Sequence, residues 1–183
     1  MEEYLELGRD YLEKAIEHLK KQLLKIRTGK AHPGLLEDIR VEYYGATVPL
    51  HQVANLSIQD ARTIIIQPWD KNMLPVIEGA IVEANLGFNP MNDGEVIRIH
   101  IPPLTEERRK QLVKQARQEG EEARISIRNA RHKMLDFIKK EVKNGYPEDV
   151  ARRKEKEVED MVKKFAEEVE KLIQAKEKDI MTV

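Results

Sequence analysis

The first 30 residues carry an apolar side chain at every seventh position, with further apolar residues at the three- and four-residue steps between. The positions of this seam are Leu5, Leu12, Ile16, Leu19, Leu23 and Ile26. Such a repeat is typical of a helix that buries one stripe against partner helices. Gly29 can adopt the left-handed conformation that ends a helix, and Pro33 prevents continuation. The pattern therefore predicts a long helix that ends near residue 29.

The middle of the chain changes to short alternating or β-branched segments that are separated by glycine, proline and asparagine. Period-two alternation and β-branched residues favour strands, whereas apolar residues three and four apart favour a helix. The predicted elements are strands at 36–43, 47–50, 62–67 and 95–101 and a short helix at 73–86. This part of the chain is therefore expected to be a compact α/β domain.

Two further long helices are predicted in the C-terminal half. Thr105 is a good N-cap, and the acidic residues after it suit the first turn of a helix. The seam of this helix is Leu112, Ala116, Ala123, Ile127, Ala130, Met134 and Phe137. Residues 144–147 form a tight connection, and the last helix has a seam at Val158, Val162, Phe165, Val169 and Leu172. None of the three helices can bury its seam alone, so together they predict a bundle.

The predicted fold class is α+β, with an elongated antiparallel three-helix bundle interrupted by a small inserted domain of β/α/β layers. Residues 1–30 and 105–183 would form the bundle, residues 31–104 the insert, and the whole an L-shaped two-domain protein. Two connecting segments tether the insert, which would restrict it to a hinge-like swing. The hinge is predicted at Lys30, Ala31, His32, Pro33, Pro102, Pro103 and Leu104. The alternative is an insert packed rigidly on the bundle.

Charge is unevenly distributed although the net charge is only −1. Residues 31–104 carry four basic and nine acidic side chains, or −5, whereas residues 105–146 carry twelve basic and seven acidic, or +5. Arg124, Arg128 and Arg131 repeat at helical spacing beside the apolar seam, which indicates a cationic stripe. Such a stripe can steer a protein onto a polyanion. The alternative is a solvated helix edge whose arginines only pack over the seam.

The sequence shows no candidate active site. There is no cysteine, no basic start followed by an apolar segment, and no apolar run of membrane-spanning length. The five histidines have no metal-ligand spacing, and phosphate-binding glycine loops and nucleophile motifs are absent. We expect a soluble cytoplasmic monomer without catalytic residues, metal or other cofactor. An alternative hypothesis is that the protein is an enzyme whose active site lies around Trp69 and Asp70, which follow a predicted strand.

Eight short motifs occur in order along nearly the whole chain. They are residues 27–31 with Pro33, Tyr44-Gly45 with Pro49-Leu50, 53–55, 68–70, 86–90, 97–99, 103–109 and the arginine-bearing 127–131. Together they resemble the ribosome recycling factor family. The resemblance implies a factor that occupies the aminoacyl side of a ribosome left on messenger after termination. Its bundle would lie against RNA of the large subunit. Elongation factor G, using GTP, would then drive the inserted domain against an intersubunit bridge and separate the subunits, releasing messenger and deacylated transfer RNA.

The resemblance also assigns RNA-contacting residues. Arg128 and Arg131 match the family's arginines, and Arg109 and Arg27 are further expected contacts; Arg124 joins them from its place on the stripe. Two positions depart from the family, which usually has arginine where this chain has His132 and Lys30. A histidine at position 132 makes the charge there depend on pH, whereas an arginine would always be charged. A lysine at position 30 lacks the planar guanidinium with which arginine can bind a phosphate through two hydrogen bonds.

A second kind of function, one that does not involve RNA binding, is also compatible with the predicted helices. In that reading the protein is a coiled-coil adaptor whose arginine stripe binds the acidic face of a protein partner. The adaptor should not pellet with large ribosomal subunits, whereas an RNA-binding factor should pellet in a salt-dependent way.

Overall fold

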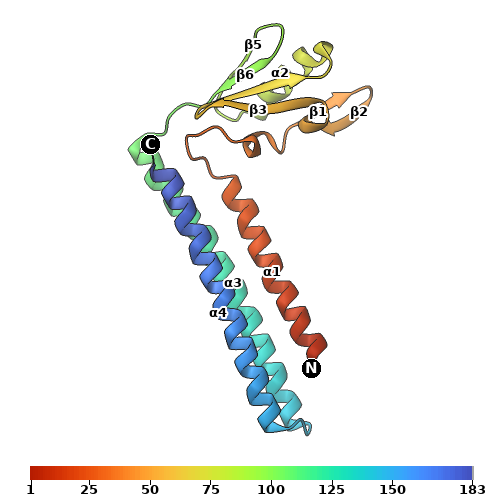
Figure 1. The fold of residues 1–183 in the computed structure, drawn as a ribbon, viewed down its shortest axis with the longest axis vertical. Coiled ribbons are helices and arrows are strands. Elements are labelled where there is room, and N and C mark those ends of the chain that lie inside the picture. Colours follow the sequence, from red (N-terminus) through yellow and green to blue (C-terminus); the bar gives the residue numbers. More distant parts are fainter. Residues whose placement is uncertain (183) are drawn as a thin grey trace. The chain divides into compact units, whose positions relative to one another are not determined.

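The computed structural model describes residues 1–182, and its contacts divide the chain into two compact units. One unit contains Met1–Ile26 and the chain from Lys110 onward, and the other is Arg27–Arg109. Residues 27–30 and 105–109, which the sequence analysis grouped with the long helices, therefore fall in the smaller unit. The α+β fold with an interrupted three-helix bundle is confirmed (Figure 1).

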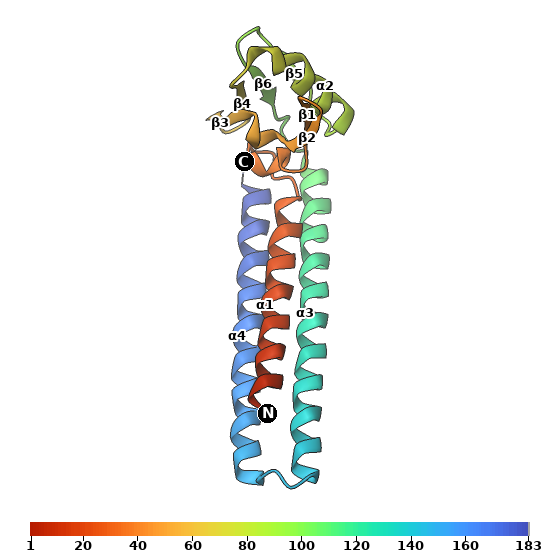
Figure 2. The same ribbon diagram turned by 90° about the vertical axis from the view of Figure 1, so that its right-hand side faces the viewer.

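The larger unit is a bundle of α1 (Glu2–Leu24), α3 (Glu106–Lys143) and α4 (Glu148–Met181). Helices α1 and α4 run in the same direction and α3 runs opposite to both, and the α3–α4 hairpin extends beyond the N-terminus of α1 (Figures 1 and 2). With 38 residues, α3 is about 57 Å long at 1.5 Å per residue. A single helix of this length presents a straight surface for the side chains described below.

The bundle core follows the predicted seams with local differences. Every seam residue predicted for α1 is buried. In α3, Phe137 is only partly buried and its ring stacks on Tyr4, with ring centroids 4.0 Å apart, whereas Ile138 lies in the core. In α4 the buried stripe is Ala151, Val158, Met161, Val169, Ile173 and Ile180. The prediction was wrong for Val162, Phe165 and Leu172, which lie partly exposed at the edge of that stripe.

Helix α1 ends earlier than the sequence predicted. Its last helical residue is Leu24, and Lys25 donates its backbone N–H to Gln22 and Leu23 in a tightened final turn. Gly29 has a φ of 76°, the left-handed conformation expected of it, but it lies in the connection that follows the helix. The left-handed glycine therefore turns the chain between the units and does not cap α1.

Gly120 allows α3 and α4 to approach closely. A Cβ atom at this position would lie 1.8 Å from Cδ1 of Ile173, which is itself buried in the core. We expect Gly120→Ala to lower the free energy of unfolding by about 1–3 kcal/mol through overpacking, measured by urea unfolding with circular dichroism. Gly79→Ala is the control, because nothing lies within 4 Å of a Cβ on this exposed residue of α2 (Leu74–Ala84). It should be neutral or stabilising, and equal effects of the two substitutions would contradict the packing argument.

The smaller unit contains two antiparallel sheets and α2. Its strands are β1 (Arg40–Tyr43), β2 (Ala46–Pro49), β3 (Ala54–Asp60), β4 (Thr63–Pro68), β5 (Pro90–Asn92) and β6 (Ile97–His100). Strands β1 and β2 form a hairpin, and the other four form a sheet in the order β3-β4-β6-β5. Strands β3 and β5 were missed in the sequence. β3 is largely exposed, and β5 has only three residues.

Helix α2 contacts both sheets of this unit, at β1 and at β5. Isoleucine is the commonest residue of the core, and its β-branched side chain suits the strands that supply most of these residues. Fully buried are Ile64, Ile66, Ile77, Ile81, Ile97 and Ile99. Asn85 ends α2 in the left-handed conformation, with φ 48° and ψ 51°.

The predicted hinge residues lie in the segments where the smaller unit begins and ends. The backbone N–H of Ala31 donates to the carbonyl of Ala61 at 2.7 Å, and that of Ile101 donates to Arg62 at 2.7 Å. His32 caps a short 3-10 helix (Pro33–Leu36) by accepting from the backbone of Gly34 at 2.9 Å. The bonds to Ala61 and Arg62 fasten both segments to the turn between β3 and β4. The hinge itself stays a prediction.

Candidate nucleic-acid interface

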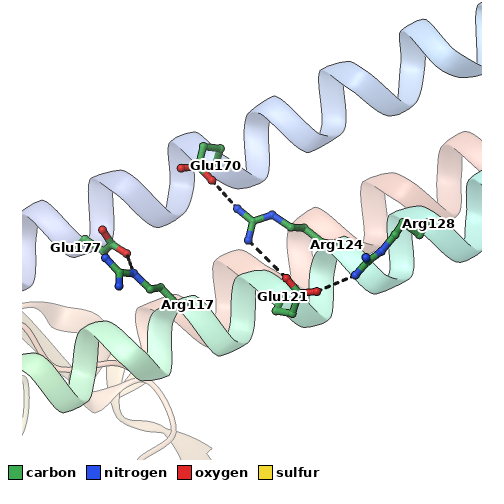
Figure 3. Close-up of polar contacts among 6 residues, drawn as sticks. All are labelled: Arg117, Glu121, Arg124, Arg128, Glu170 and Glu177. Carbon is green, nitrogen blue, oxygen red and sulfur yellow. Dashed lines mark hydrogen bonds and ion pairs between the residues drawn. The ribbon is translucent and has the colours of Figure 1, made fainter.

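Three arginines of α3 form a row along its edge with α4. Arg117, Arg124 and Arg131 are seven residues apart, a spacing that returns a helical side chain to nearly the same face. Each donates to a glutamate of α4. Arg117 donates to Glu177 at 2.5 Å and Arg124 to Glu170 at 2.5 Å (Figure 3). Arg131 donates to Glu159 at 2.8 Å. We call these three residues the arginine row.

The antiparallel register of α3 and α4 explains these partners. Moving seven residues forward on α3, from Arg117 to Arg124, corresponds to moving seven residues back on α4, from Glu177 to Glu170. Arg131 reaches Glu159, and its Nε donates to both carboxylate oxygens, at 3.0 and 3.2 Å. Every member of the row therefore has an intramolecular counter-ion on α4.

Arg128 lies outside this row and has no partner on α4 among the described residues. Its Nη2 donates to Glu121 of its own helix at 2.7 Å, and 59% of its side chain is exposed. Glu121 also lies 3.8 Å from Nη1 of Arg124, so one carboxylate is shared between two guanidinium groups (Figure 3). Arg128 is thus the stripe arginine most open to an external anion.

The carboxylates of α4 stabilise the charged form of the row. The hydrogen bond that Arg117 donates to Glu177 raises the pKa of Arg117, and the bond that Arg131 donates to Glu159 raises the pKa of Arg131. Arginine is already fully protonated near neutral pH. The row is therefore cationic over the whole physiological range, and its charge does not act as a switch.

The ion pairs leave some N–H donors of these arginines available to bind phosphate. A guanidinium has five N–H donors, and the pairs of Arg124 and Arg128 each engage only part of them. The side chains of Arg124 and Arg131 are each 37% exposed. Exposed ion pairs stabilise a protein by only about 0–1 kcal/mol. A phosphate can therefore take the place of a carboxylate at little energetic cost, and the arrangement suits a polyanion that supplies several phosphates together.

The other two predicted contacts belong to the smaller unit. Arg27 lies over the ring of Phe88, with Cζ 5.4 Å from the ring centroid, and its guanidinium fills the space beside Gly87. Arg109 lies at the end of the same unit, and its Nε is buried without a hydrogen-bond partner among the described residues. Neither belongs to the row described above. Arg117 was not among the predicted residues, although its seven-residue distance from Arg124 was available in the sequence.

Glu121 is expected to limit the affinity of this surface for RNA, because it competes with phosphate for two arginines. We expect Glu121→Gln to tighten binding to large ribosomal subunits by about twofold to fivefold, the size of effect typical of exposed charges. Cosedimentation at constant salt measures it. Glu122→Gln is the matched control, since it removes the same charge from an exposed neighbour that has no ion pair in the described chain. Weaker binding, or an equal gain in both variants, would contradict the competition.

Neither a metal-binding cluster nor a membrane-spanning helix occurs among the described residues. Within residues 1–182, no group of three or more histidine, aspartate or glutamate side chains could hold a metal ion. None of the described helices combines the length and apolar character needed to cross a bilayer. Trp69, where the alternative hypothesis placed an active site, is 70% exposed and thus lies on the surface.

A three-helix bundle interrupted by a small unit of sheets and one helix defines the class of this protein. Residues 19–181 match the family model described as Ribosome recycling factor, and the chain belongs to this family. The ribosome-recycling factor of Parabacteroides distasonis is 50% identical over 180 residues, which cover 98% of this chain and 96% of that protein.

Two solved structures are similar to the chain. A solution structure of the ribosome recycling factor has a TM-score of 0.84 and 40% identity, and covers 100% of this chain and 97% of that chain. A second structure has a TM-score of 0.69 and 43% identity, and covers 99% of this chain and 98% of that chain. It describes models for the T. thermophilus ribosome recycling factor and the E. coli elongation factor G bound to the E. coli post-termination complex.

Proposed function

We propose that this chain binds the post-termination ribosome and, with elongation factor G and GTP, separates it into subunits for new initiation. The observation that carries the proposal is family membership over nearly the whole length, including a relative of 50% identity. A structural neighbour with 43% identity is described together with elongation factor G on the post-termination complex. The separation of subunits would release messenger and deacylated transfer RNA.

The RNA-binding surface in this proposal is the arginine-bearing face of α3. Arg124, Arg128 and Arg131 would contact phosphates of large-subunit ribosomal RNA, with Arg117 extending the row. Their support is the exposure of the side chains and the weak, replaceable ion pairs that hold them. Arg109 and Arg27 stay expected contacts from the family resemblance. For Arg27 an RNA contact would compete with its packing on Phe88.

The protein acts in this proposal without covalent chemistry, in the cytoplasm and as a monomer. Its work would be mechanical, since the bundle binds and the smaller unit moves under the action of elongation factor G. The adaptor alternative, in which the arginine stripe binds the acidic face of a protein partner, is separated from this proposal by salt-dependent cosedimentation with large ribosomal subunits, because an adaptor should not pellet.

Light scattering tests the proposed function. Post-termination ribosomes are mixed with this protein, elongation factor G and GTP, and the separation of subunits lowers the scattered intensity. We expect a fall that requires all three components. Omission of elongation factor G, or replacement of GTP by GDP, is the control. A scattering signal that does not change in the complete mixture would contradict the proposal.

A further inference from the structure

An apolar hollow lies in the bundle between the first half of α1 and the C-terminal half of α3. Helix α1 lines it with Tyr4, Leu7, Gly8 and Tyr11, which share one face because they are three, four and seven residues apart. The hollow has a volume of about 140 Å³. An apolar cavity of about 150 Å³ can hold a benzene-sized ring. The hollow is therefore large enough for one aromatic ring of a small molecule.

Helix α3 supplies the inner surface of the hollow. Ala130 and Met134 line it and are both buried. Gly8 allows Met134 to approach α1 closely, because a Cβ atom at this glycine would lie 2.3 Å from Sδ of Met134. On the α1 side, two apolar side chains are left uncovered, since Leu7 is 65% exposed and Tyr11 is 46% exposed. A ligand in the hollow would remove apolar surface of these two side chains from water.

Hydrogen-bond donors without partners also line the hollow. Within residues 1–182, no acidic side chain pairs with Lys133, and the hydroxyl groups of Tyr4 and Tyr11 form no hydrogen bonds. Lys133 is exposed. An ammonium group is a donor and carries a positive charge, and a phenol can donate one hydrogen bond. This combination of groups attracts an anion and repels a cation.

We propose that this hollow binds a small aromatic carboxylate, with its ring between α1 and α3 and its carboxylate at Lys133. The ring would lie against apolar and tyrosine side chains, and the carboxylate would accept a charge-assisted hydrogen bond. Ligand sites commonly combine a mostly apolar lining with a few polar groups that fix the orientation of the ligand. The inference does not depend on the proposed function, because no member of the arginine row lines the hollow.

Titration of the full-length protein with 4-fluorophenylacetate tests the site. Fluorine NMR of the probe measures its affinity, and methyl NMR of the six methionines locates it. We expect a Kd of about 0.1–3 mM, as for other ligands of this size. The methyl signal of Met134 should shift, whereas that of Met73, in the smaller unit, should not. Absence of binding in this range, or binding without a shift at Met134, would overturn the inference.

The role of charge is tested with a neutral probe and with lysine variants. We expect 4-fluorobenzyl alcohol to bind about threefold to fivefold more weakly than 4-fluorophenylacetate. Lys133→Gln should weaken binding of the carboxylate by the same factor and leave binding of the alcohol unchanged. Lys140→Gln is the matched control, because Lys140 is an exposed lysine of the same helix that does not line the hollow. Equal affinities of the two probes, or equal losses in the two variants, would overturn the inference.

The apolar part of the site is tested by Leu7→Ala, which should weaken binding of 4-fluorophenylacetate by about threefold through lost apolar cover. Leu24→Ala is the control, since Leu24 is an exposed leucine of the same helix outside the hollow. Circular dichroism verifies that each variant is folded. An unchanged affinity of Leu7→Ala would contradict the placement of the ring.

Adenosine 5′-monophosphate tests the other possible occupant, a nucleotide of RNA, because a nucleobase also stacks on tyrosine. In competition with 4-fluorophenylacetate, we expect unlabelled phenylacetate to displace the probe at a lower concentration than adenosine 5′-monophosphate does. The reverse order would indicate a nucleotide site and overturn the inference.

Discussion

Arg128→Glu is expected to weaken binding to large ribosomal subunits by more than about tenfold, while the thermal midpoint of unfolding stays nearly unchanged. The substitution removes a phosphate contact and adds a charge that repels RNA. The new carboxylate would also face Glu121, now 2.7 Å from the guanidinium, so both acids would turn toward solvent. The free energy of unfolding should change little, because the ion pair between Arg128 and Glu121 is exposed and lies within one helix. Cosedimentation at fixed salt measures the affinity.

Arg9→Glu is the matched control for this reversal. Arg9 is also an exposed arginine of the bundle, at 49%, and its ion pair is also within its own helix, with Glu6 at 3.8 Å. The net charge changes by the same amount in both variants, so any effect of total charge is shared. We expect Arg9→Glu to change affinity by less than about twofold. A similar loss in both variants would show that the site on α3 is not specific.

Ala130→Glu is expected to unfold the bundle, although it lies only two residues from Arg128. Ala130 is 4% exposed and belongs to the seam that α3 buries. A carboxylate at this buried position would lose its hydration among apolar side chains, which destabilises a protein by about 3–5 kcal/mol. For a chain of 183 residues this lowers the melting temperature by roughly 10 °C or more. Circular dichroism at 222 nm measures the transition.

Asn129→Glu provides the control for this prediction, since Asn129 is exposed on the same turn of α3. Its melting temperature should lie within about 2 °C of the parent protein, as is usual for surface substitutions. If Ala130→Glu melts as Asn129→Glu does, the assignment of the buried face of α3 is wrong. The pair of Arg128 and Ala130 thus separates the binding face of the helix from its packing face.

The sequence predicted the bundle well because its seams repeat over many turns. One wrong position in α3 and three in α4 do not displace the helices, because the wrong positions in α4 lie at the edge of the buried stripe. The short strands were predicted less well: β3 was missed although Ala54, Leu56 and Ile58 alternate with polar residues, and its burial is confined mainly to Ala54. The end of α1 was also misplaced, because left-handed glycine signals a change of direction without giving the last helical residue.

The counter-ions of the arginines could not be predicted from the sequence. Their identity depends on the register between α3 and α4, which is set by the packing of both helices and by the turn that joins them. The spacing of Arg124 and Arg128 indicated a cationic stripe but did not distinguish their surroundings. In the structure the first pairs across helices with Glu170, and the second only with Glu121. This difference makes Arg128 the better test of the binding face.

The salt dependence of binding to large ribosomal subunits tests the central claim most directly. If arginines of α3 bind RNA phosphates, the logarithm of affinity should fall linearly with the logarithm of salt concentration. Loss of one contact in Arg128→Gln should make that slope shallower by about 0.7–0.9. Glu122→Gln should leave the slope as it is. Binding that is insensitive to salt, or a slope that Arg128→Gln does not change, would contradict the account.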